Sequence, residues 1–153
     1  MSTMEQKPRK VRIASVVFDT YQAYLGLDYR KEQVEALVQS ARSQARIQYG
    51  ESRLDLIVLT EDIMGSKSDS VSEAAWDYGT DLEAWAGNLA RSASAYVVLC
   101  TLRVVDSARG DFRNSAFLID RAGKTVGVYD KIHPVLDGPN DDSRATTFEG
   151  GVT

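Results

Sequence analysis

Lys131 is placed where a strand would hold a cation firmly at its end. The residues 114–120 form a mainly apolar run, and 125–129 alternate apolar and other side chains. Gly123 between them can adopt the positive φ of a short hairpin loop with a bulge. Lys131 and His133 follow the second strand, so an ammonium on a stiff hairpin could act on a substrate. The alternative is an edge-strand lysine that keeps the sheet soluble.

Glu61 is a second candidate, because it follows a buried strand. The apolar run 54–60 comes after an apolar run at 11–18 and an amphipathic helix at 29–48. Strand, helix and strand in this order predict a parallel pair with the helix packed on one face. Functional groups collect beyond the carboxyl ends of such strands, where Glu61 lies. The alternative is a solvated loop acid.

Cys100 and His133 are the only cysteine and the only histidine, which limits metal and thiol chemistry. A single cysteine excludes an intramolecular disulfide framework and a multi-cysteine zinc site, and one histidine leaves few options for a histidine-based metal centre. We therefore predict no metal and no cofactor. Cys100 lies within the apolar segment 96–104 without a nearby cation, so we interpret it as a small buried hydrophobic residue.

The chain as a whole reads as an α/β domain with five strands and two main helices. We predict both helices on one face of the sheet and an apolar surface on the other face. The segment 11–18 is apolar enough to be buried on both faces. Asp28 is the expected N-cap of the first helix, and Thr80 with Glu83 resembles a capping box for the second. The expected strands are 11–18, 54–60, 96–104, 113–120 and 124–130, and the expected helices are 29–48 and 81–94.

Composition is ordinary for a folded domain, with 43% hydrophobic and 26% charged residues. The formal net charge of −4 gives no general electrostatic reason to bind nucleic acid. No run approaches the ~18 apolar residues of a membrane span, so we expect no membrane partner. Residues 1–10 form a polar, flexible tail without an apolar signal region, and we expect a cytoplasmic protein.

Three segments resemble the carbon–nitrogen hydrolase (nitrilase) superfamily. The longest, RNSAFLIDRAGKTVGVYDKIHP, is similar to the family pattern Y-N-T-A-x-L-I-D-x-x-G-x-x-x-G-x-Y-x-K-x-H-L, and its lysine falls on Lys131. The segment LIVLTE resembles the family's L-V-V-F-P-E, whose glutamate falls on Glu61. The segment FEGGVT resembles a family glutamate followed by G-V-T-P-G, which falls on Glu149.

The resemblance implies a fold and an activity. The fold is the N-terminal half of an α-β-β-α sandwich, with residues 11–153 as an incomplete domain. The activity is hydrolysis of non-peptide C–N bonds in small amides, carbamoyl compounds or nitriles, without a cofactor. In the family a glutamate base, matched by Glu61, and a lysine, matched by Lys131, act with a cysteine nucleophile, and the glutamate matched by Glu149 supports the lysine.

The resemblance also implies that this chain alone is inactive. The family's nucleophile follows the lysine, in a segment resembling G-x-I-C-W/F-D, and we expect it beyond Thr153. Family members usually form homo-oligomers, so the full-length protein is expected to do so. The alternative function is a non-catalytic α/β binding or interaction module derived from the family. A reading frame that continues into a strand ending in Cys-Trp-Asp would favour the enzyme.

Overall fold

A computed structural model describes residues 9–19, 23–65, 74–77, 80–106, 108–109, 111–133 and 151–152. The described residues form one mixed sheet of six strands in sequential order, together with two helices. In chain order the elements are β1 (Ile13–Ser15), α1 (Leu27–Tyr49), β2 (Leu56–Val58), α2 (Asp81–Ala93), β3 (Tyr96–Asp106), β4 (Asp111–Ile119), β5 (Thr125–Asp130) and β6 (Gly151–Val152).

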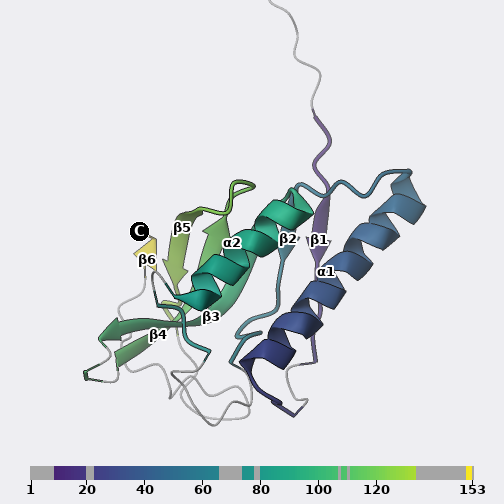
Figure 1. The fold of residues 1–153 in the computed structure, drawn as a ribbon. Coiled ribbons are helices and arrows are strands. Elements are labelled where there is room, and N and C mark those ends of the chain that lie inside the picture. Colours follow the sequence, from purple (N-terminus) through teal and green to yellow (C-terminus); the bar gives the residue numbers. More distant parts are fainter. Residues whose placement is uncertain are drawn as a thin grey trace, which may run out of the picture.

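The sheet changes from parallel to antiparallel at β3. β1 and β2 are parallel, as the strand–helix–strand pattern predicted, and β3 continues parallel to β2, whereas β3 to β6 are antiparallel neighbours. Figure 1 shows α1 and α2 together in front of the sheet, on the same face. The α/β class and the placement of both helices on one face are therefore confirmed. None of the helices in the described ranges has the length and apolar character needed to cross a membrane.

The main hydrophobic core lies between the helices and the sheet. Val34 and Val38 of α1 pack there with Leu99 of β3 and Phe117 of β4, all fully buried. Trp76, which fits no helix or strand pattern in the sequence, stacks on Phe117 with ring centroids 4.2 Å apart. Burial of this apolar surface stabilises the packing of the helices on the sheet and holds the strands in fixed positions.

At β1 the opposite face of the sheet is apolar and exposed, as predicted, whereas Leu102 of β3 and Asn114 of β4 on the same face are buried. Ile13 is 61% exposed and Val17 is 84% exposed, while the alternate residue Val16 is buried under the helices. The expectation that segment 11–18 is buried on both faces is therefore wrong for the described chain. Its composition predicted a strand covered on both faces, but only one face has a covering layer here.

The start of α1 and the capping of α2 differ from the predictions, although α2 begins at Asp81 as expected. α1 begins one residue before Asp28, because Gly26, with φ 102°, serves as the N-cap and its carbonyl accepts the Arg30 N–H. Thr80 is the N-cap of α2, but its hydroxyl donates to the Asp77 carbonyl at 2.6 Å and makes no cap hydrogen bond. The reciprocal capping box is thus wrong, since a local turn takes the hydroxyl.

The β4–β5 hairpin forms as the sequence predicted. Gly123 has φ 79°, and the register shifts between Leu118 and Ile119, which is the expected bulge. The hairpin tip also touches α2, because a Cβ on Gly123 would lie 2.7 Å from the Gly87 carbonyl oxygen. This close approach needs two glycines and ties the hairpin to the helix.

Candidate active site

Glu61 and Lys131 meet at one edge of the sheet. Glu61 begins the turn after β2, and Lys131 is the residue after β5. The Lys131 Nζ lies 2.7 Å from Glu61 Oε1, and the two side chains are 26% and 59% exposed, respectively. Although 70 residues separate them in sequence, the two candidate side chains form an ion pair. Their predicted proximity is confirmed.

Asn114 completes this site, and our sequence reasoning missed it. Its Nδ2 donates to Glu61 Oε1 at 2.9 Å, and its carbonyl accepts the Lys131 N–H at 2.8 Å. The pairing of Ser115 with Asp130 places Asn114 directly opposite Lys131 on the same face of the sheet. The available signal was its position in the segment RNSAFLID, opposite the residue that follows the second strand of the predicted hairpin.

The turn that carries Glu61 is anchored by a buried arginine. Arg30 of α1 is 1% exposed, and its Nη1 donates to the Ile63 carbonyl at 2.7 Å. The Ile63 N–H donates to the Cys100 carbonyl at 3.1 Å, and Asp62 adopts a positive φ of 46°. Burial lowers the pKa of Arg30 from its ordinary value, and its guanidinium packs 4.6 Å over the Phe18 ring. The turn is therefore fixed from both sides, which restrains the position of the Glu61 backbone.

Cys100 lies on the open face of the sheet, opposite Ala116 of β4. It is half-buried rather than fully buried, because the helices cover the other side of β3. Burial, followed by the negative charges of Glu61 and Asp62, raises the pKa of the Cys100 thiol to about 11. A thiol with such a pKa carries little thiolate at neutral pH, so it is a poor nucleophile.

A second carboxylate, Asp130, lies one residue before Lys131 but on the helix-covered face. It is 2% exposed and accepts hydrogen bonds from Arg103 Nη2 at 2.5 Å, Arg113 Nη1 at 2.8 Å and Ser115 Oγ at 2.6 Å. Burial by itself would raise the pKa of Asp130, but these three donors outweigh it and lower the pKa below its ordinary value. This cluster fixes the register of β3, β4 and β5 beneath the Glu61 site.

Glu149, the third candidate from the sequence, lies outside the described residues. His133 is exposed after β5. No group of three or more potential metal ligands occurs among the residues that the structure describes. The groups that the structure brings together at this site are a carboxylate, an ammonium and an amide.

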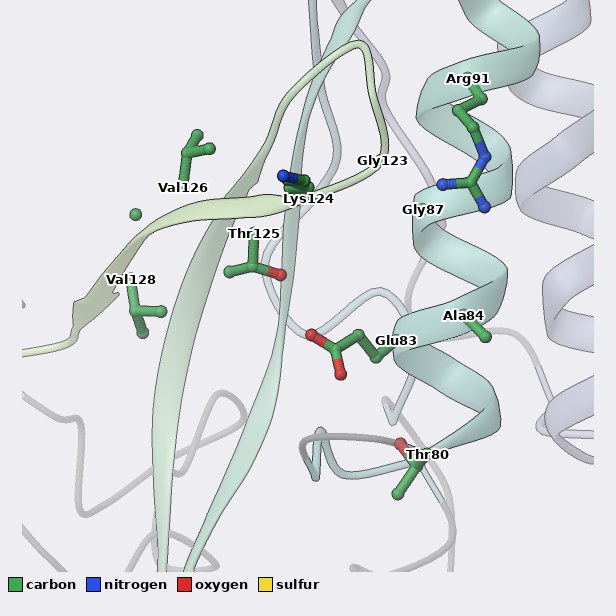
Figure 2. Close-up of a pocket in the computed structure, with 11 residues that line it drawn as sticks. Thr80, Glu83, Ala84, Gly87, Arg91, Gly123, Lys124, Thr125, Val126 and Val128 are labelled. Atoms are coloured by element: carbon green, nitrogen blue, oxygen red, sulfur yellow. The ribbon is translucent and has the colours of Figure 1, made fainter.

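A groove of about 770 Å³ lies elsewhere, between α2 and the β4–β5 hairpin. Figure 2 shows the Glu83 side chain extending from α2 toward Thr125 of β5, with Arg91 near Gly123. Neither Glu61 nor Lys131 lines this groove. The groove and the candidate site therefore share no lining residue.

Residues 14–152 match the sequence model of the carbon–nitrogen hydrolases. The chain belongs to the carbon–nitrogen hydrolase family. No curated protein sequence matches it significantly. The resemblance stated from the motifs is thus confirmed over nearly the whole chain.

Solved structures of the nitrilase superfamily share this fold. A carbon–nitrogen hydrolase from Helicobacter pylori G27 superposes with a TM-score of 0.64 at 21% identity, over 90% of this chain and 44% of that one. Saccharomyces cerevisiae Nit3 gives 0.65 at 14% identity, over 91% and 49%. An amidase from Nesterenkonia sp. gives 0.62 at 17% identity, over 91% and 48%. The chain therefore spans less than half the length of each of these structures.

Proposed function

We propose that this chain supplies the glutamate and the lysine of a carbon–nitrogen hydrolase that acts on small amides or carbamoyl compounds, or on nitriles. The observation that carries the proposal is the 2.7 Å contact between Lys131 Nζ and Glu61 Oε1. Both residues occupy the positions where the family motifs have their glutamate and lysine. Family membership makes the solvated loop acid and the edge-strand lysine the weaker interpretations.

In the proposed reaction on an amide, Glu61 carries the proton and Lys131 stabilises charge. A cysteine thiol gives its proton to Glu61, and its sulfur forms a bond to the substrate carbon. The Lys131 ammonium donates to the oxygen on which negative charge develops. Glu61 passes its proton to the leaving nitrogen as the C–N bond breaks. Water then adds to the carbon while Glu61 takes its proton, and the C–S bond breaks as the sulfur recovers that proton.

The nucleophile in this proposal lies outside residues 1–153. Cys100 is a poor candidate for this role, because it sits within β3 rather than beyond a strand end and because burial raises the pKa of its thiol to about 11. A solved structure of the Nesterenkonia amidase is similar in the residue types concerned: it holds acrylamide in a double mutant that replaces a glutamate and a cysteine. We therefore propose that residues 11–153 are an incomplete hydrolase domain and that the 153-residue chain is inactive alone.

The test compares this chain with a protein extended past Thr153 and with the Cys100→Ser variant of each. Each is offered amides, carbamoyl compounds and nitriles, and turnover is measured. We expect turnover from the extended protein and from its Cys100→Ser variant, but none from the 153-residue chain. Turnover by the short chain that disappears in Cys100→Ser would overturn the proposal. Substrate binding without turnover by the extended protein would favour a non-catalytic binding module.

A further inference from the structure

We propose that Asn114 is a positioning residue that fixes Glu61 through Oε1 and leaves Oε2 to exchange protons. The inference rests on the catalytic roles proposed for Glu61 and Lys131. It concerns a residue for which the motifs gave no role.

The hydrogen bonds to Glu61 are concentrated on one of its two oxygens. Lys131 Nζ and Asn114 Nδ2 both donate to Oε1, at 2.7 and 2.9 Å. Within the described residues, Oε2 of Glu61 accepts no hydrogen bond. Two donors on one oxygen orient the carboxylate and make the other oxygen the one available to a thiol, a leaving nitrogen or water.

Asn114 is the more rigid of the two donors. Glu61 is 59% exposed on a turn, so its side-chain torsions are weakly restrained by packing. Asn114 is 7% exposed and lies within β4, paired with Leu102 on one side and bonded through its carbonyl to Lys131 on the other. A short amide on a central strand holds a fixed position better than a lysine with four rotatable side-chain bonds.

This arrangement also separates two duties of Lys131. An ammonium that stabilises the substrate's developing negative charge must donate toward the substrate, which weakens its hold on Glu61. Asn114 carries no charge to offer the substrate and keeps its hydrogen bond to Oε1 through that change. Because its carbonyl also holds the Lys131 backbone, one residue sets the spacing of both catalytic groups.

The experiment uses the full-length enzyme and the isosteric change Asn114→Asp, together with Asn114→Ala. Asn114→Asp removes the donor and adds a like charge beside Glu61. We expect kcat to fall by roughly 10- to 100-fold, the usual effect of a lost hydrogen bond to a charged group, with KM changed by less than about threefold. The matched control is Asn88→Asp, the same change at an exposed position on α2, which should leave both constants unaltered.

A double-variant cycle shows whether Asn114 acts through Glu61. In the Glu61→Gln background, Asn114→Asp should lower the residual kcat by less than about twofold, whereas a general structural role would give the full loss again. If Glu61→Gln alone leaves kcat intact, the proposed function itself is wrong. If Glu61→Gln abolishes turnover while a folded Asn114→Asp keeps the wild-type kcat, only the role of Asn114 is overturned.

Folding of each variant is checked by thermal unfolding. Should Asn114→Ala not fold, Asn114→Asp and Asn114→Ser, which keep a polar side chain of equal or smaller volume, provide the kinetic comparison. If none of the three folds, Asn114 is a packing residue and the inference is overturned.

Discussion

Asp130 and Glu61 are two carboxylates that bond neighbouring residues of β4 from opposite faces of the sheet. Asp130 is 2% exposed and accepts hydrogen bonds from three side chains, two of them arginines. The Glu61 side chain is 59% exposed, and its two donors share one oxygen. Both depend on the alternation along β4, where Ser115 faces Asp130 and Asn114 faces Glu61.

The difference between these carboxylates separates a structural site from a reactive one. A buried carboxylate whose oxygens are all engaged cannot take up a proton without breaking its pairs, so Asp130 is suited to hold the sheet. A carboxylate with one oxygen available to solvent can exchange protons at little cost to folding, which suits Glu61 to general acid–base work. We expect substitutions at Asp130 to affect stability and substitutions at Glu61 to affect activity.

The largest expected effect follows Glu61→Gln in the full-length enzyme. Removing a general base typically costs about 10²- to 10⁴-fold in kcat/KM. The free energy of unfolding should change by less than about 1 kcal/mol, because an exposed ion pair contributes little. The measurements are steady-state kinetics and urea unfolding. Glu51→Gln, which removes another exposed ion-paired carboxylate, is the control and should keep full activity. A large stability loss in Glu61→Gln would contradict the contrast between the two sites.

Asp130→Asn should have the next largest effect, on the free energy of unfolding. It leaves Arg103 and Arg113 without their carboxylate, and breaking a buried ion pair typically costs about 3–5 kcal/mol. Urea unfolding of the 153-residue chain at neutral pH measures the change. A change in unfolding free energy below about 1 kcal/mol would mean that Asp130 contributes no more than an exposed ion pair, which would contradict its structural role.

The pH dependence of unfolding tests the same cluster. Because the pKa of Asp130 is lowered in the folded state, its stabilisation is present above the unfolded-state pKa, about 3.9. That stabilisation is lost as the pH falls below this value and through the folded pKa. The difference in unfolding free energy between the wild type and Asp130→Asn should therefore shrink in acid. A difference that is constant from pH 7 to pH 3, roughly, would contradict this assignment.

The sequence predicted the Glu61–Lys131 contact but not the Asp130 cluster. Glu61 and Lys131 each follow a strand end, and a motif resemblance points to both. Arg113 and Asp130 look like surface charges in the sequence, because nothing local indicates that the helix-side face of β4 and β5 would bury Asp130 and partly bury Arg113. Their partners come from different strands, and pairing across strands depends on a register that single-strand patterns do not specify. The start of α1 was missed for a similar reason, since glycine at Gly26 gave a weaker signal than Asp28.

Ser115→Ala measures how much one of the donors to Asp130 contributes to stability. It removes the 2.6 Å hydrogen bond to Asp130 but leaves both arginines in place. We expect a loss of about 1.5–3 kcal/mol in unfolding free energy, as for a hydrogen bond to a charged group. Activity of the full-length enzyme should be retained, although Ser115 is the direct neighbour of Asn114. Loss of kcat in a folded Ser115→Ala enzyme would mean that the two faces are coupled.

The smallest expected effect concerns Cys100, which shares the open face with Glu61. With a pKa of about 11, only about 0.1% of the thiol is ionised near pH 8, so alkylation by iodoacetamide should be far slower than for a small free thiol. Burial is the main cause of the raised pKa, and the Glu61 charge comes second. Glu61→Gln should therefore accelerate alkylation, but only by roughly two- to threefold. Asp130→Asn, measured where the variant is still folded, should leave the rate unchanged because Asp130 faces the other side of the sheet. Equal acceleration by both variants would show that the rate reports loosening of the fold rather than the charge of Glu61.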